Sequence, residues 1–268
     1  MPYKCIKIDI KDEIATLTFN RPEKLNALNP ALLHEVIDAM GKLDQDDGVK
    51  VLIMTGEGRA FCTGADLSEE AKATDKNQPG LSRSEHITPF VTLGRGILEI
   101  DKFTKPVIAA VNGLAVGAGL SYALAADVRF ASDKAQFAAI FIRRGLVPDA
   151  GASYFLTRLV GVSKAMELMW TGEMVSAQEA ERIGMVNHVV PHDQLMQSTR
   201  EFALKLAKGP SLAIDMVKRM AYTALKADSV RTQMGVEDYM QQVARESEDV
   251  REGIQAFLEK RPPNFKGI

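Results

Sequence analysis

The sequence lacks most of the residues from which metal centres and disulfide frameworks are built. Its 268 residues include only two cysteines, Cys5 and Cys62, and neither has metal-ligand spacing around it. The four histidines form no metal-binding pattern, and His188 and His192 flank Pro191, so they are not expected to share a helical face. We therefore expect no metal site and no disulfides, and the scarcity of cysteine favours a reducing, cytoplasmic location.

An excess of charge of one sign and long apolar runs are also missing. The formal net charge is -2, with 25% charged residues, so nucleic acid is not an expected partner. No apolar run reaches the roughly 20 residues that span a bilayer, and the first residues lack the apolar core of a signal peptide. A membrane is therefore not an expected partner either.

The sequence does contain a repeated alternation of apolar strands and helices. Alternating residues predict an antiparallel hairpin over 3–10 and 14–20, and a helix with one apolar face is predicted to begin after Asn29. Beyond it, buried parallel strands should alternate with helices that cover both faces of a sheet. The predicted strands are 50–56, 105–113 and 127–132, and the predicted helices are 87–100 and 117–126.

The C-terminal third changes character and is predicted to be almost entirely helical. Helix-like segments are 164–172, 176–184, 192–209, 211–227 and 250–261. We place a boundary near residue 195, between an α/β core over 1–195 and a helical region over 196–268. The polar stretch 68–84 is expected to be a mobile segment or lid that lines the substrate pocket together with the following helix.

Two glycine-rich turns carry the first chemical signal. In VLIMTGEGRAFCTGADL and in VIAAVNGLAVGAGLSYAL, a strand is followed by such a turn, and the second turn opens a helix. Glycines allow a backbone to approach a ligand closely, and a helix N-terminus offers unpaired N–H groups, so two such turns could hold one oxygen. The same glycines could serve only tight turns and close packing. Gly113, Gly117 and Gly119 do not have dinucleotide-binding spacing.

The order and spacing of several motifs resemble the enoyl-CoA hydratase/isomerase (crotonase) superfamily. The motifs are FCTGADL, NGLAVGAGLSYALAADVRFAS and FIRRGLVPDAGASYFLTRLVG, supported by NRPEKLNAL, AERIGMVNHVVP and EGIQAFLEKRPPNFKG. The resemblance implies an α/β fold, a crotonase-like spiral of ββα turns with a helical C-terminal trimerisation region, assembled as a homotrimer or a dimer of trimers. It also implies acyl-CoA thioester substrates and no cofactor beyond the coenzyme A that the substrate carries.

The resemblance assigns an oxyanion hole to the backbone N–H groups of Ala65 and Ala118. Removing a proton next to a thioester carbonyl puts negative charge on the carbonyl oxygen. Preorganised donors stabilise this charge, and loss of one donor in other enzymes costs about 3 to 4 kcal/mol.

The residues at the acid positions distinguish the reactions that members of the family catalyse. Hydratases of the family use two glutamates, whose positions here are occupied by Ser121 and Phe141, and neither of these can act as a general base. Asp149, in the turn GLVPDAG, resembles the acid of the family's single-aspartate isomerases, which move a double bond by taking a proton from C2 and returning it at C4. An apolar turn is expected to raise the pKa of Asp149. Without the resemblance, Asp149 would be interpreted as a helix cap.

The resemblance also implies substrate-binding positions around these groups. Lys24 is placed near the nucleotide, and Phe265 and Lys266 are placed at the coenzyme A, with a neighbouring subunit as one option. The other predicted positions are Ala27, Thr63, Gly64, Asp66, Leu67, Leu114, Gly117, Ser121, Phe141 and Pro148. From the residues alone, Asp66 is expected to order its own loop and Cys62 to be a small buried side chain.

The favoured function is an enoyl-CoA isomerase, of the Δ3,Δ2 type or a related ring-acyl type, with Asp149 as proton shuttle. The first alternative is an enoyl-CoA hydratase with an atypical active site. The second is an acyl-CoA hydrolase or dehalogenase with Asp149 as nucleophile, although the histidine and tryptophan of such dehalogenases would fall near Gly94 and at Phe141. The third is a non-catalytic acyl-CoA-binding protein.

Overall fold

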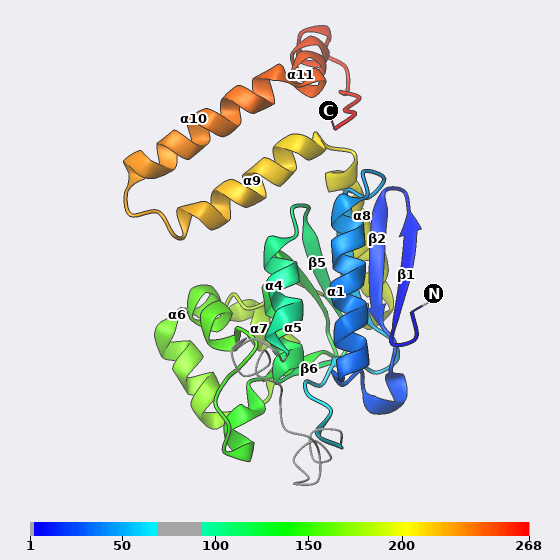
Figure 1. The fold of residues 1–268 in the computed structure, drawn as a ribbon, viewed down its shortest axis with the longest axis vertical. Helices are drawn as coiled ribbons and strands as arrows, with labels where there is room; N and C mark the ends of the chain where they lie inside the picture. The colour runs from blue at the N-terminus through cyan, green and yellow to red at the C-terminus, as the bar shows by residue number, and fades with distance from the viewer. Residues whose placement is uncertain (1–2, 69–92, 268) are drawn as a thin grey trace, which may run out of the picture.

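The computed structural model describes residues 3–68 and 93–267 (Figure 1). Three repeats form the centre of its body, each with a strand in a large sheet, a short strand in a small sheet and then a helix. The repeats are β3 (Val51–Gly56), β4 (Ala60–Cys62) and α4 (Gly94–Lys102); β5 (Val107–Val111), β6 (Leu114–Val116) and α5 (Ala118–Ala125); and β7 (Val128–Ser132), β8 (Gln136–Ala138) and α6 (Ala152–Thr171). This is the ββα spiral that the resemblance implied.

The two sheets are mainly parallel. The large sheet has the order β1-β2-β3-β5-β7-β10, and only β1 (Ile6–Lys11) runs antiparallel, as the hairpin partner of β2 (Ile14–Phe19). The small sheet has the order β4-β6-β8-β9, with β4, β6 and β8 parallel to one another and β9 (Val175–Ser176) antiparallel to β8. Because β4 and β6 are parallel neighbours, the turns that follow them lie at the same edge.

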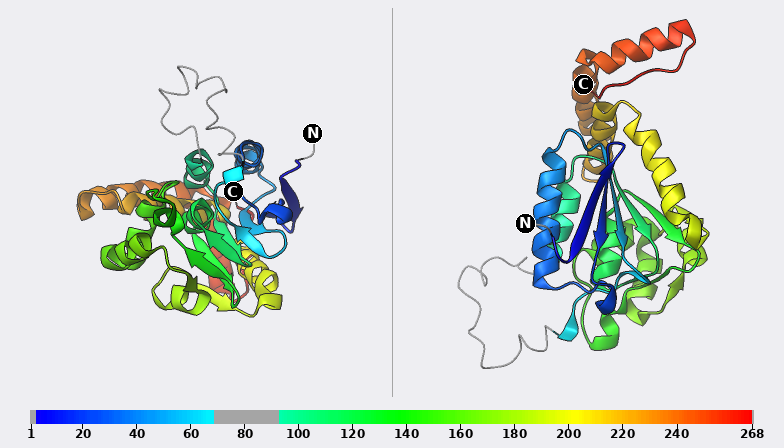
Figure 2. Two further views of the ribbon diagram at one scale, coloured as in Figure 1. Left: turned by 90° about the horizontal axis from the view of Figure 1, so that it is seen from below. Right: turned by 90° about the vertical axis from the view of Figure 1, so that its right-hand side faces the viewer.

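Alternate side chains of the large sheet enter two hydrophobic layers. Leu52 and Met54 face a core that also receives the apolar face of α1 (Pro30–Gln45), whose N-cap Asn29 accepts a hydrogen bond from the backbone N–H of Leu32 at 2.9 Å. Val51 and Ile53 face a second layer closed by α8 (Leu195–Ala207), and Figure 2 shows α1 and α8 on opposite faces of the sheet.

The packing of α8 corrects the predicted boundary at residue 195. Leu195, Ala203 and Ala207 of this helix are buried against the second face of the sheet, so α8 belongs to the body. A parallel sheet needs both faces covered, which is why the chain leaves the body only after this helix. The helical extension begins at α9 (Ser211–Ala224) and continues through α10 (Val230–Glu246) and α11 (Glu248–Glu259).

The extension, α9 to α11, projects from one end of the body (Figures 1 and 2). Near its root the Nζ of Lys218 forms an ion pair with Asp127 at 2.9 Å, and the hydroxyl of Tyr222 donates to the same carboxylate at 2.8 Å. Large apolar side chains are exposed along the extension: Val217, Leu225, Val230, Met234, Tyr239, Ile254, Phe257 and Leu258. Over the two described ranges, no helix is both long and apolar enough to cross a bilayer.

Candidate active site

The two glycine-rich turns predicted from the sequence lie against each other. Gly64 follows β4 with φ +82°, and a Cβ added there would stand 3.1 Å from the backbone nitrogen of Ala118. On α5, a Cβ at Gly119 would collide with the backbone carbonyl of Cys62. Glycine at both positions therefore allows the end of β4 to approach the first turn of α5 closely.

Ala65 and Ala118 present their backbone N–H groups from these turns. Ala118 is the first residue of α5, after Gly117 with φ +57°, so its N–H precedes the helical hydrogen bonds. Ala65 is flanked by bonds to Leu28, whose N–H donates to Gly64 at 2.7 Å and whose carbonyl accepts from Asp66 at 2.9 Å. Ala65's own N–H points away from Leu28, and neither alanine N–H has an acceptor within the described residues.

The loop 20–28, which carries the predicted nucleotide-binding residue Lys24, lies beside the glycine-rich turns. Asn26 is fully buried, and its side chain accepts from the N–H of Arg21 at 2.9 Å and donates to the carbonyl of Ala60 at 2.8 Å. Lys24 is exposed on this loop. Nearby, Ala27 is buried and its N–H donates to the Lys24 carbonyl, while the Thr63 hydroxyl donates to the carbonyl of Leu25.

Asp66 has the loop-ordering role expected from its residue type. One carboxylate oxygen accepts from the hydroxyl and the N–H of Ser68, at 2.6 and 3.2 Å, and the other pairs with Arg21 at 2.9 Å. The Ser68 hydroxyl first, and then Arg21, hold the pKa of Asp66 below its ordinary value. Arg21 was not predicted, although it belongs to the quoted NRPEKLNAL motif. Among the other predicted contacts, Leu67 is exposed and Leu114 is half-buried.

The turn around Asp149 differs from its prediction in two ways. The Asp149 side chain is exposed, so the costly apolar burial expected from the neighbouring residues is wrong. The helix-cap interpretation fails as well, because α6 begins at Ala152 with Gly151 as its N-cap and without a side-chain cap. Pro148 is half-buried, and the N–H of Ala152 donates to the backbone carbonyl of Asp149 at 2.9 Å.

The two positions at which hydratases of the family carry glutamates are buried. Ser121 has no exposed surface, and its hydroxyl donates to the backbone carbonyl of Asp149 at 3.3 Å. Phe141 is 6% exposed and packs in the main core. Neither side chain is placed to hold a water molecule for addition to a double bond.

Asp149 lines a cavity of about 500 Å³, large enough for an acyl group. The helix after the polar stretch contributes to it, as expected, although residues 69–92 lie outside the described ranges. A second carboxylate, Asp101 at the end of α4, lines the same cavity. Ile97 and Leu98 lie on this helix, and the lining residues that the sequence did not predict are Tyr154, Phe155 and Lys226. Tyr154 and Phe155 could have been predicted from the sequence, since they follow Asp149 within two helical turns.

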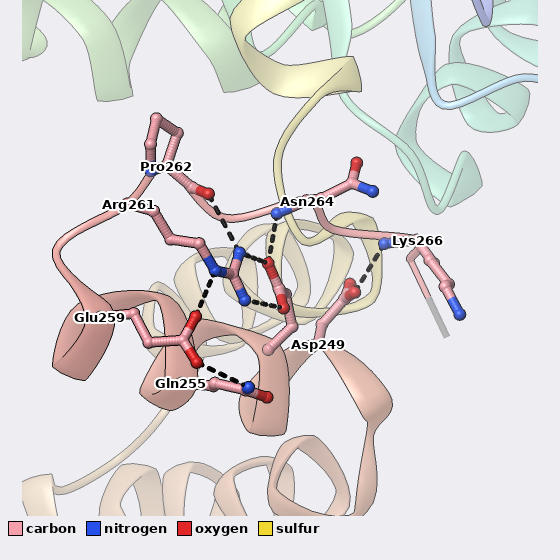
Figure 3. Close-up of polar contacts among 8 residues, drawn as sticks. Asp249, Gln255, Glu259, Arg261, Pro262, Asn264 and Lys266 are labelled. Atoms are coloured by element: carbon pink, nitrogen blue, oxygen red, sulfur yellow. Dashed lines mark hydrogen bonds and ion pairs between the residues drawn. The ribbon is translucent and has the colours of Figure 1, made fainter.

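Phe265 and Lys266 do not join the site within one chain. The N–H of Lys266 donates to Asp249 at 2.7 Å (Figure 3). Its Nζ pairs with Glu248 at 3.3 Å, so both groups are held at α11. Phe265 packs beside Gly253 of the same helix. The C-terminus therefore lies at the opposite end of the molecule from β6 (Figure 1), and the predicted coenzyme A contact would need another subunit.

The remaining candidate residues have structural roles. Cys62 is completely buried, and burial raises the pKa of its thiol to about 12, which makes it a poor nucleophile. His192 shares a hydrogen bond of 2.9 Å with the hydroxyl of Ser132, and His188 packs against Phe130. In the described part of the chain, no three metal-ligating side chains come together.

Comparison with known proteins now places this geometry in a family. The sequence model of the enoyl-CoA hydratase/isomerase family matches residues 9–268. The chain belongs to this family. The enoyl-CoA hydratase/isomerase family acts on acyl-CoA thioesters, which agrees with a cavity of acyl size at the Asp149 turn.

Relatives of the chain within the family have different names. A probable enoyl-CoA hydratase of Rhodobacter capsulatus is 40% identical over the full length of both proteins. The 1,2-epoxyphenylacetyl-CoA isomerase of Escherichia coli is 35% identical, over 96% of this chain and 97% of its own. The crystal structure of an enoyl-CoA hydratase from Bacillus anthracis superposes with a TM-score of 0.90 at 32% identity, covering 99% of this chain and all of its own.

Proposed function

We propose that the protein is an enoyl-CoA isomerase in which Asp149 shuttles one proton. The observation that carries the proposal is the pair of buried residues, Ser121 and Phe141, at the positions of the hydratase glutamates, with Asp149 exposed on the acyl-sized cavity. The similarity to the Escherichia coli isomerase supports it.

The reaction needs one base and one site for negative charge. The Asp149 carboxylate takes the C2 proton of a 3-enoyl thioester, and the electron pair of the C–H bond moves into the thioester carbonyl. The N–H groups of Ala65 and Ala118 stabilise the resulting charge on oxygen. The protonated Asp149 then gives the proton to C4, leaving the double bond between C2 and C3. No electrons are exchanged with a second reactant, so we propose no cofactor beyond the substrate's coenzyme A.

Hydration is the second candidate, because the Rhodobacter capsulatus relative is named a hydratase. A hydratase built on Asp149 would have to activate water and protonate carbon with one carboxylate, since Ser121 and Phe141 supply no second acid. One acid suffices for migration of a double bond, which is why isomerisation is favoured.

Product analysis separates the two reactions. Purified protein is incubated with a 3-enoyl-CoA panel carrying straight, branched and cyclic acyl groups, and in parallel with the corresponding 2-enoyl-CoA esters. We expect 2-enoyl-CoA to form from at least one 3-enoyl ester and to be detected by NMR, with no 3-hydroxyacyl-CoA. Hydration of the 2-enoyl esters without migration of a double bond would contradict the proposal.

We further propose that the chain assembles as a homotrimer or a dimer of trimers. The exposed apolar side chains along α9 to α11 support this, since such a surface is costly in water. Light scattering should give three or six times the chain mass of 29.3 kDa, and a monomer at micromolar concentration would contradict the proposal. Assembly would also decide whether Phe265 and Lys266 reach a neighbouring site.

A further inference from the structure

The hydroxyl of Ser121 connects two parts of the proposed active site. It is completely buried on α5 and donates to the backbone carbonyl of Asp149, 28 residues away in the sequence, at 3.3 Å. We propose that Ser121 is a positioning residue, which fixes the Asp149 turn relative to the oxyanion hole. The inference rests on the proposed function, because it assigns Ser121 a role only if Asp149 moves the proton.

The placement of Ser121 on α5 gives this hydrogen bond its importance. Ala118, the proposed oxyanion donor, is the first residue of the same helix, and residues three apart lie on the same helical face. The rigid first turn of α5 therefore carries the donor for the carbonyl oxygen at one end and the hydroxyl that holds the acid's turn at the other. The distance between oxyanion hole and base is set through this one turn of helix.

The Asp149 turn needs such support because its backbone is unusual. Ala150 has φ +47° and Gly151 has φ +80°, so two consecutive residues adopt the left-handed region, which is strained for alanine. The carbonyl of Asp149 is held from both sides, by the N–H of Ala152 within the turn and by Ser121 from α5. Ser121 thus supplies a contact that anchors the turn to a different element.

A buried serine that merely satisfies its own hydroxyl would predict a different result on mutation. Loss of such a hydrogen bond lowers the stability of the fold but leaves the chemical step unchanged. Ser132, which lies on β7 and outside the site, is a matched example. It is also fully buried, and its hydroxyl shares a hydrogen bond with His192. Ser132→Ala therefore serves as the control for Ser121→Ala.

The experiment compares kcat, KM and melting temperature for five variants on a 3-enoyl-CoA substrate. Ser121→Ala should lower kcat by about tenfold with KM changed less than about twofold, since a displaced base affects the chemical step more than binding. Ser121→Thr, which keeps a hydroxyl, should recover most of kcat. Ser132→Ala should keep the wild-type kcat even if its melting temperature falls. In the double variant Ser121→Ala with Asp149→Asn, the rate should equal that of Asp149→Asn alone.

The outcomes distinguish the inference from the proposed function. Wild-type kcat in Ser121→Ala, or an equal loss of rate with and without Asp149, would overturn the positioning role while Asp149 stays the base. Full isomerase activity in Asp149→Asn would overturn the proposed function itself. If Ser121→Thr fails to fold, the comparison of Ser121→Ala in the two Asp149 backgrounds still decides the question.

Discussion

Replacing Asp149 by asparagine should lower kcat for double-bond migration by about 10³-fold, with little change in acyl-CoA affinity. The amide has nearly the same shape as the carboxylate but cannot accept a proton at neutral pH, and general-base catalysis contributes about 10² to 10⁴ in rate. Because Asp149 is exposed on its cavity, we expect the fold to be retained. Steady-state kinetics on a 3-enoyl-CoA, with binding measured by calorimetry, test both parts.

Asp101→Asn is the matched control for this variant. It removes a second carboxylate, at the end of α4, from the described lining of the cavity. We expect its kcat to fall by less than about tenfold, because it changes the charge of the cavity without removing the base. Equal losses in the two variants would mean that charge in the cavity, rather than proton transfer by Asp149, controls the rate.

Replacing Ala118 by proline should lower kcat by about 10² to 10³-fold, since it deletes one oxyanion donor and puts a ring carbon in its place. Ala118 is the first residue of α5, the one helical position at which proline is well tolerated, so the helix should still form. The effect should appear in kcat more than in KM, because the charge on oxygen develops in the transition state. Kinetics and circular dichroism of the purified variant provide the measurement.

Ala118→Gly keeps the N–H group and is the control for the proline variant. It should retain most of the wild-type kcat, at a modest cost in stability. An active proline variant with an intact helix would show that the Ala118 N–H does not stabilise the carbonyl oxygen.

Much of the fold could be predicted because its periodic segments are long enough to be informative. The β1-β2 hairpin, α1, β3, β5 and β7 all follow from alternation or from continuous apolar runs. The strands β4, β6 and β8 have only three residues each, which is too short for a period, so the small sheet came only with the resemblance. The α10 helix was not predicted, and α8 was assigned to the wrong part because its sequence does not reveal which surface it covers.

The candidate site also has parts that could be predicted from the sequence and parts that could not. The glycine-rich turns have a local signal, and the structure brings Gly64 against Ala118 as the parallel strands require. The environment of Asp149 could not be predicted, because its exposure depends on the cavity formed with α4 and α6 rather than on its neighbours in the chain. No sequence pattern predicts the hydrogen bond from the Ser121 hydroxyl to the Asp149 carbonyl, because it joins two separate elements.

The close contact between Gly119 and Cys62 has a consequence for how such a site can change during evolution. The groups proposed to bind the thioester oxygen belong to the main chain, so mutation of the Ala65 or Ala118 side chain to another small residue leaves them in place. Selection therefore falls on Gly119 and Gly64, because the absence of a side chain at both positions permits the two backbones to meet. Related proteins can therefore keep the proposed binding site for the thioester oxygen through these glycines. A substitution of the acid on a separate turn can then change where the proton is transferred.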